Sequence, residues 1–337
     1  MSKKRDEYWQ TIRGICILCV IMIHSLYLTD MFYLNISNII IRKIINFAVA
    51  TFIFMAGYFV HINNLKNFYI SKIKRLIIPM MIWNLVYMII NYRNCLSSLS
   101  TMTLLKDFIF STSTMYLYYI YVLIQLFLIT PFLIKLSNSD NAIRKYFPIL
   151  ITPFYNAMLF ICNYFISFNI PLYNYWLFGW ISYFYLGILL KQQNVSKKEN
   201  RKFPMVSLFA SILEGVLIYI SKSEQYNLAV SQLAIFNSIY SLNLCYFLVI
   251  NKAKIENCNL KLKWLRITLI KLGNYSFGIY LSHVFILTII KKFISKLSLN
   301  YYINVVLTFG MTAIIAYIAN MIYYERVKEL KNGKSYR

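Results

Sequence analysis

The sequence predicts an all-α, polytopic membrane protein, built as a bundle of about ten transmembrane helices with both termini in the cytoplasm. Of its 337 residues, 59% are hydrophobic and only 14% are charged, against about 45–50% and about 25% in soluble proteins. The mean hydropathy is +0.57. The chain also holds 25 Phe and 30 Tyr, whereas disordered segments are poor in aromatic residues. These observations exclude a soluble globular protein and a disordered one.

Ten apolar runs account for the predicted spans, because about 20 residues cross about 30 Å of hydrocarbon. They are residues 10–29, 44–62, 76–92, 115–134, 146–166, 174–190, 204–220, 228–250, 273–290 and 302–324. The first run lacks a small-residue cleavage site, so we expect a retained span and not a signal peptide. Only short loops and tails remain, so we expect one transmembrane domain over residues 1–337 and no separate soluble domain.

The basic residues indicate the orientation. With the N-terminus placed inside, 27 of the 35 Lys and Arg residues fall on the cytoplasmic side, which predicts a multi-pass protein with both termini inside. The net charge of +24 would suggest nucleic acid in a soluble protein. Here the charges lie in short loops between apolar runs, so we expect contact with membrane lipid and no nucleic-acid partner.

The six cysteines lie mostly within or beside apolar runs, so no disulfide framework is expected. Cys16 and Cys19 form a C-x-x-C pair, but no second pair or nearby His stands at zinc spacing. We therefore expect these cysteines to pack in the bundle and predict no metal site.

Four ionisable residues fall within the apolar runs, where they are costly and are retained mostly for function. They are Arg13, His24, Glu214 and His283. Arg13 and His24 are eleven residues apart, which is three helical turns plus about 20°, so they share one helix face about 16 Å apart. Two plainer interpretations stay open: Arg13 as a residue that snorkels to the interface, and His24 as a packing histidine hydrogen-bonded to a neighbour.

Neutral histidine is the usual general base near neutral pH, which makes His24 the candidate base. Glu214 is the candidate carboxylate that holds its tautomer. Glu214 and His283 each fall about ten residues from the cytoplasmic start of their spans, so we expect both in the same mid-membrane layer as the deep end of the first span. They could orient His24, bind substrate or pair with each other.

Five segments, in order along the chain, resemble the motifs of the acyltransferase-3 family of membrane O-acyltransferases. They are IRGICILCVIMIH (12–24), TFIFMAGYF (51–59), KIKRLIIPMMIW (72–83), LYYIYVLIQLFLITP (117–131) and LGNYSFGIYLSHVFIL (272–287). Three positions depart from the family pattern. Ala56 replaces a Ser, Tyr118 a frequent Trp, and Lys72 a common Arg, so a point charge replaces the bidentate guanidinium fork there.

This resemblance implies transfer of an acyl group, most often acetyl, from cytosolic acyl-CoA to a hydroxyl of a glycan or lipid-linked sugar. It implies that His24 is the general base, and that Arg13, Lys72 and Arg75 either bind the phosphates of CoA or order the cytoplasmic mouth of the site. His283 matches the late motif histidine. The abundance of Ile, Asn, Lys and Tyr suggests an AT-rich bacterial source, and therefore the plasma membrane and a surface glycan.

A transporter or exporter of glycans or small metabolites is the alternative, because isolated buried ionisable residues also fit proton-coupled transport. The chain lacks evident repeated halves with paired Gly- or Pro-broken spans, which are the best sequence indication of a transporter site. A polytopic scaffold or sensor without chemistry is a third interpretation, but it leaves the four deep ionisable residues unexplained.

Overall fold

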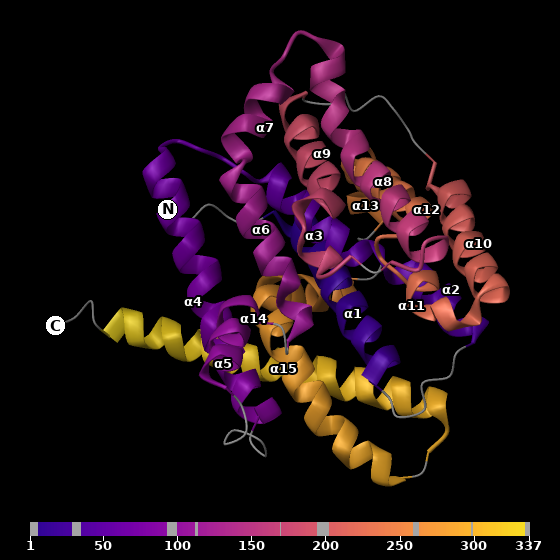
Figure 1. Cartoon of the computed structure of the whole chain (residues 1–337). Coiled ribbons are helices and arrows are strands. Elements are labelled where there is room, and N and C mark those ends of the chain that lie inside the picture. Colours follow the sequence, from indigo (N-terminus) through magenta and orange to yellow (C-terminus); the bar gives the residue numbers. More distant parts are fainter. Residues whose placement is uncertain are drawn as a thin grey trace. The chain divides into compact units, whose positions relative to one another are not determined.

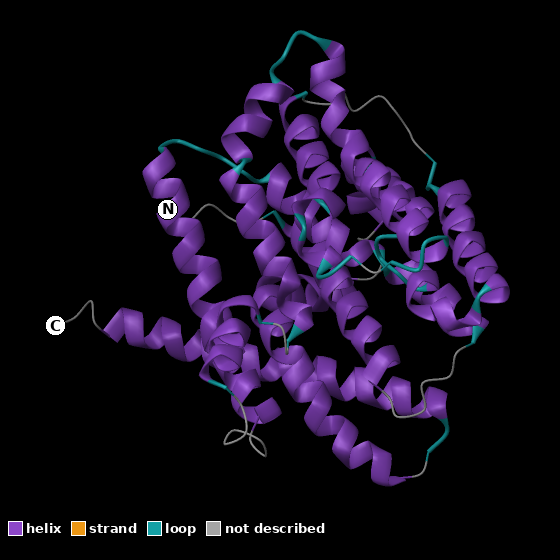
Figure 2. Cartoon of the chain, viewed as in Figure 1, coloured by secondary structure: helices purple, strands orange, loops and turns teal. Residues whose placement is uncertain are grey.

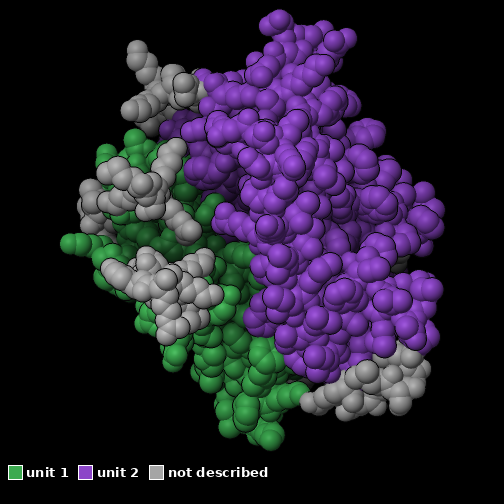
Figure 3. All heavy atoms as spheres, turned by 90° about the vertical axis from the view of Figure 1, so that its left-hand side faces the viewer, with its two compact units in different colours: residues 1–38, 252–337 green, residues 39–251 purple. Residues whose placement is uncertain are grey.

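A computed structural model gives the fold of the chain (Figure 1). It describes residues 6–28, 35–92, 100–111, 114–168, 170–193, 202–258, 263–297 and 299–333. These residues form helices joined by turns and loops, with no strand among them (Figure 2). The chain divides into two compact units, residues 1–38 with 252–337 and residues 39–251, which we call unit 1 and unit 2 (Figure 3).

The described helices confirm the all-α membrane character. Six of them are long and apolar enough to cross a membrane: Glu7–Leu26, Ile36–Tyr58, Leu65–Tyr92, Ala142–Tyr164, Lys263–Leu297 and Tyr301–Val327. The helices Tyr118–Leu128 and Thr130–Ser137 form a seventh candidate, bent by 58° at their junction. Met205–Ser221 and Ile235–Ile250 are apolar but shorter. The described part of the chain therefore holds six or seven candidate spans by length and composition.

Unit 1 joins the two ends of the sequence. Its helices are α1 (Glu7–Leu28), α13 (Lys252–Cys258), α14 (Lys263–Ile294) and α15 (Tyr301–Gly333), with the short 3-10 turn η7 (Ser295–Leu297). Helix α14 packs along α1 on one side and along α15 on the other. Glycine allows the closest approach: a Cβ at Gly14 would collide with the backbone carbonyl of Leu269, and a Cβ at Gly273 with that of Gln10.

Polar contacts brace this helix group at both ends. The Asn320 side chain of α15 donates to Ser282 Oγ of α14 at 3.1 Å. At the end of α1, Tyr301 Oη donates to the Leu26 carbonyl at 3.4 Å and accepts from Asn38 Nδ2 at 2.7 Å. Interhelical hydrogen bonds of this kind fix the orientation of neighbouring helices, because apolar packing alone gives little preference for one orientation.

Unit 2 contains most of the remaining helices; α2 (Ile36–Ile45) crosses the boundary between the units. The others are α3 (Phe47–Tyr58), α4 (Leu65–Tyr92), α5 (Thr101–Phe110), η2 (Met115–Leu117), α6 (Tyr118–Leu128), α7 (Thr130–Ser137), α8 (Ala142–Tyr164), η3 (Tyr173–Tyr175), η4 (Leu177–Gly179), α9 (Ile181–Gln192), α10 (Met205–Ser221), η5 (Ser223–Gln225), α11 (Tyr226–Ala229) and α12 (Ile235–Ile250). Helix α9 packs against α3 and α8, and α12 packs against α10, α3 and α8. Every residue of α9 from Ile181 to Leu190 is buried, so this short helix forms the centre of unit 2.

Helix α8 stays intact despite Pro148 and Pro153 within it. Ser182 Oγ donates to the Pro148 carbonyl at 3.0 Å and accepts from the Thr152 backbone N–H at 2.9 Å. In return, Thr152 Oγ1 accepts from the Ser182 backbone N–H at 3.1 Å. Hydroxyl side chains thus satisfy the backbone groups that the prolines disturb, as membrane helices require, and they fix α8 to α9.

Several boundaries differ from the apolar runs. The predicted run 76–92 is the second part of α4, which begins at Leu65 because Lys72 and Arg75 continue the helix. The run 174–190 holds only the 12-residue helix α9, preceded by η3 and η4. Helix α5 was not expected from the apolar pattern. It is capped at its start by Ser100, whose side chain accepts from the Thr103 backbone N–H.

Candidate active site

Helix α1 carries two of the predicted site residues in one unbroken helix. Arg13 and His24 both lie within Glu7–Leu28 and are half-buried. The regular rise of the helix separates them by about 16 Å along its axis. The expected arrangement of the two residues on one helix therefore holds, with His24 near the end of α1 and Arg13 in its first half.

His283 of α14 lies beside His24. The centroids of the two imidazole rings are 5.1 Å apart and their planes are inclined by 54°. This pair belongs entirely to unit 1, and the close approach of α1 to α14 at Gly14 and Gly273 allows it. Residues 259 positions apart in the sequence thus form one cluster.

Hydrogen bonding fixes the tautomer of His283. Its Nδ1 lies 2.6 Å from the Tyr280 carbonyl oxygen, and because a carbonyl can only accept, Nδ1 carries the proton. The side chain is fully buried, and Nε2 has no hydrogen-bond partner within the described protein. In the neutral imidazole that nitrogen holds a lone pair, so His283 presents an acceptor on the interior side of α14.

The surroundings hold this acceptor in place. Ser282, the preceding residue, donates to the Gly278 carbonyl at 3.1 Å and accepts from Asn320 of α15. The Tyr280 ring lies 5.8 Å from the His283 ring. Rotation of α14 is therefore restricted on both sides, and a buried basic nitrogen without a partner is expensive unless a substrate or a neighbouring side chain uses it.

Glu214 has other partners, all in unit 2. Its Oε2 lies 3.4 Å from the Lys43 ammonium, and these side chains are 7% and 0% exposed. The carboxylate also accepts from the backbone N–H groups of Ile235 at 2.9 Å and Phe236 at 3.2 Å, the first residues of α12. Glu214 therefore joins a buried ion pair to a helix N-terminus, where negative charge is stabilised.

Lys72 and Arg75 lie on α4, also in unit 2. The Lys72 ammonium lies 4.4 Å from the Phe127 ring centroid and 5.4 Å from that of Phe68, so two aromatic faces hold it. Arg75 follows at three-residue spacing, which makes it a neighbour on the helix surface, and it is exposed. These two cations lie close enough together to engage the phosphates of one ligand.

Sequence reasoning missed two features of these sites. Lys43 lies one residue before the predicted run 44–62, in what was expected to be a loop. In the structure it belongs to α2 and is the buried partner of Glu214. The amphipathic run Ile36–Ile45, which ends in Arg42 and Lys43, was the available signal. The tautomer of His283 depends on the Tyr280 carbonyl, which no side-chain pattern reveals. Among the described residues, no group of three or more His, Cys, Asp or Glu side chains could hold a metal ion, and the four cysteines whose side chains are described form no disulfide.

Comparison with known proteins gives one match. The family model Acyl_transf_3, described as "Acyltransferase domain", matches residues 6–323, which is nearly the whole chain. No curated protein and no solved structure matches the chain. The matched range contains both His24 and His283, together with every other predicted site residue.

Proposed function

This chain belongs to the acyltransferase-3 family of membrane acyltransferases, and from that premise we propose that it moves an acetyl group from cytosolic acetyl-CoA to a hydroxyl of a glycan or lipid-linked sugar. The observation that carries the proposal is the contact between His24 and His283, two imidazoles 5.1 Å apart within one helix group. Family membership favours acyl transfer over the transporter alternative. The aliphatic and aromatic surroundings of the pair suit a reaction that must exclude water.

His24 is the general base of the proposed reaction. As the acceptor oxygen attacks the thioester carbonyl, His24 takes the hydroxyl proton, so a C–O bond forms while the C–S bond breaks. The protonated imidazole then gives this proton to the departing thiolate, and CoA leaves as the thiol. A base that both accepts and returns one proton needs a pKa near the working pH, which histidine has.

His283 is the proposed positioning residue. Two imidazoles at this centroid separation reach the about 3 Å nitrogen–nitrogen distance of a hydrogen bond when their nitrogens face each other. Nε2 of His283 is an acceptor that no described side chain occupies. In the proposed reaction, a turn of the His24 ring lets one of its nitrogens donate to this acceptor and leaves the other unprotonated. This is the task that the sequence assigned to Glu214. The contacts of Glu214 with Lys43, Ile235 and Phe236 support a structural role for that carboxylate instead.

Three cations are the proposed contacts for the phosphates of CoA. Lys72 and Arg75 are neighbours on α4 and are the proposed phosphate contacts of unit 2, whereas Arg13 on α1 is a separate proposed contact of unit 1. Guanidinium and ammonium groups at the ends of membrane helices are chemically suited to phosphate. The chemistry that CoA itself supplies is the activated thioester; the protein orients it and handles the proton.

The proposed topology has ten crossings of a bacterial plasma membrane, with both termini inside. To the six long spans it adds the bent pair α6–α7, counted as one crossing, and the shorter helices α9, α10 and α12. Helix α9 has only 12 residues and is preceded by the turns η3 and η4, so this crossing would include irregular backbone. Irregular backbone within a membrane is tolerated where protein covers it, and α9 is buried by protein. The distribution of Lys and Arg supports this orientation.

Release of free CoA tests the proposal. Purified protein in liposomes receives acetyl-CoA, with and without a glycan acceptor, and the free thiol is measured. We expect His24→Ala to lower the rate about 10²- to 10⁴-fold, the usual contribution of a general base. His61→Ala, an exposed histidine after α3, is the matched control and keeps the wild-type rate. Retained activity in a folded His24→Ala protein would contradict the proposed base.

A further inference from the structure

Unit 2 contains a cavity that none of the proposed catalytic residues lines. It has a volume of about 240 Å³ and lies between the end of α8, the turn η5, helix α11 and the segment that leads into α12. Typical pockets for drug-sized ligands have about 300–1,000 Å³, so this cavity is matched to a single small ring and not to a CoA molecule. In the proposed topology, all these segments lie at the extracytoplasmic ends of their helices.

The cavity is lined mainly by uncharged hydrogen-bonding groups. The side chains of Asn163, Gln225 and Asn227 supply amides, Tyr173 and Ser231 supply hydroxyls, and Glu224 is the one ionisable acid. No Lys or Arg lines it, so its chemistry does not favour an anion. A single carboxylate is also too few for a divalent cation, which takes six or more oxygen ligands when it is Ca²⁺.

Buried polar atoms of two side chains, one lining the cavity and one near it on α8, lack protein partners. Gln225 donates through Nε2 to the Asn163 carbonyl at 3.0 Å, but its buried Oε1 accepts no hydrogen bond from the described protein. Asn156 is fully buried, and neither of its amide atoms has a protein partner. On α8, Asn156, Leu159 and Asn163 follow at i, i+3 and i+7 and so share one face. The last two line the cavity, and unpartnered buried amides are rare enough to indicate a ligand or water site.

The walls of the cavity are fixed, as a binding site requires. Asn46 Nδ2 donates to the carbonyls of Val230 and Ser231 at 3.0 and 3.3 Å, and Arg42 donates to that of Val230 at 3.4 Å. The Lys43–Glu214 pair then holds the first turn of α12. The hydrogen bonds from Asn46 and Arg42 and the Lys43–Glu214 pair thus stabilise the same connection between α11 and α12.

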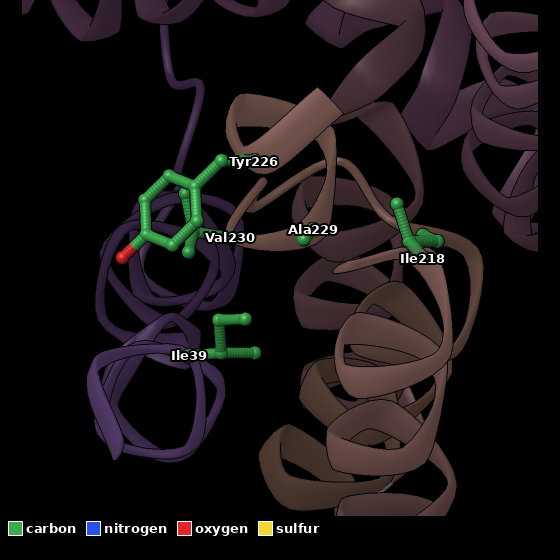
Figure 4. Packing of buried hydrophobic residues seen from close by; sticks show 5 residues of the cluster. All are labelled: Ile39, Ile218, Tyr226, Ala229 and Val230. Carbon is green, nitrogen blue, oxygen red and sulfur yellow. The ribbon is translucent and has the colours of Figure 1, made fainter. Parts of the chain in front are cut away.

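An apolar cluster lies next to the cavity. Figure 4 shows its five buried members, which come from α2, α10 and the α11 region: Ile39, Ile218, Tyr226, Ala229 and Val230. Leu228, which lines the cavity, packs against this cluster. The cavity therefore has a hydrophobic side formed by Leu159, Leu228 and Leu233 beside its amides and hydroxyls.

We propose that this cavity binds one sugar unit of the acceptor glycan. A pyranose ring is uncharged, presents hydroxyls that both donate and accept, and has an apolar face of C–H groups, which are the three features that the lining complements. Amide side chains pair with vicinal hydroxyls through their donor and acceptor atoms together. The assignment to an acceptor rests on the proposed function, whereas the assignment to a sugar rests on the cavity itself.

Sugar binding can be measured without catalysis. Saturation-transfer NMR is recorded on the full chain in detergent micelles with the methyl β-glycosides of glucose, galactose and N-acetylglucosamine as probes. We expect wild-type protein to transfer saturation to at least one of them. Asn227→Leu, which removes an exposed amide from the lining, should weaken binding at least about tenfold, the loss of one to two hydrogen bonds. Leu228→Trp should abolish it by filling the cavity.

Two controls make the outcome decisive. Asn67→Leu is the same substitution at an exposed asparagine of α4 and should bind the probe like wild type. His24→Ala should also bind it while losing CoA release, so a failure of the catalytic proposal leaves this result unaffected. No transfer to any glycoside in wild-type protein would overturn the sugar assignment. Unchanged binding in both Asn227→Leu and Leu228→Trp, with both proteins folded, would overturn the location.

Discussion

Both units of this protein bury ionisable side chains among their helices, but the partners of these side chains differ. In unit 2, the Glu214 carboxylate meets Lys43 and two backbone N–H groups, so its charge is balanced. In unit 1, His283 uses one nitrogen on the Tyr280 carbonyl, while the other is buried without a protein partner and lies on a ring close to His24. The difference teaches that depth alone does not identify a catalytic residue. The remaining hydrogen-bonding capacity of a buried group is the better indicator.

The largest expected effect concerns stability in unit 2. Glu214→Leu leaves the Lys43 ammonium buried without its counter-charge, and breaking a buried pair in this way costs about 3–5 kcal/mol. Thermal unfolding in detergent, followed by intrinsic fluorescence, measures this loss. The double variant Lys43→Met with Glu214→Leu removes both charges and should recover most of it. A Glu214→Leu protein as stable as wild type would show that the pair is not structural.

The next effect tests whether the close packing of α1 on α14 positions His24 beside His283 in unit 1. A Cβ at Gly273 would collide with the Gln10 carbonyl, so Gly273→Ala must push α1 away from α14 and displace His24 from His283. A misplacement of about 1 Å costs roughly 10²-fold in turnover, which CoA release measures. Gly310→Ala is the matched control, because nothing lies within 4 Å of the added carbon. Equal rates in the two variants would mean that the close helix approach does not position the site.

The smallest expected effect concerns an exposed ion pair at the N-terminus of α1. Arg266 of α14 lies 2.9 Å from Glu7 at the start of α1, with these side chains 25% and 49% exposed. Solvent screens such a pair, so Arg266→Gln should lower the unfolding free energy by only about 0.2–1 kcal/mol, and less at high salt. A loss of unfolding free energy as large as that in Glu214→Leu would show that the exposed pair stabilises the protein as much as the buried pair does.

The sequence predicts the helical architecture well, because long apolar runs have only one stable form in a membrane. It predicts the ends of helices less well. Helix α4 begins eleven residues before its apolar run, since Lys72 and Arg75 continue it with their aliphatic stems along the helix. The 12-residue length of α9 was also not evident, because a buried helix and the irregular turns before it are equally apolar.

The candidate site could be predicted in part. The spacing of Arg13 and His24 on one helix follows from helical geometry alone. Both histidines could be singled out because they are ionisable residues within apolar runs. Their contact could not, because it depends on glycine-mediated packing of two helices that are distant in sequence. Glu214 shows the opposite case: its depth suggested a partner for His24, whereas Lys43 and the start of α12 occupy it. No periodic pattern specifies which of several buried polar groups pair.

One measurement tests the contrast between the two units most directly: the rate of CoA release by two folded variants, His283→Leu, which has no acceptor, and the double variant Lys43→Met with Glu214→Leu. Loss of the His283 acceptor misplaces the base, so we expect the first rate to fall roughly 10²-fold with little change in Tm. The second variant, which removes a structural pair, should keep a rate within about threefold of wild type once folded. The reverse result, an active His283→Leu protein and an inactive but stable double variant, would contradict the assignment of catalysis to the histidine pair.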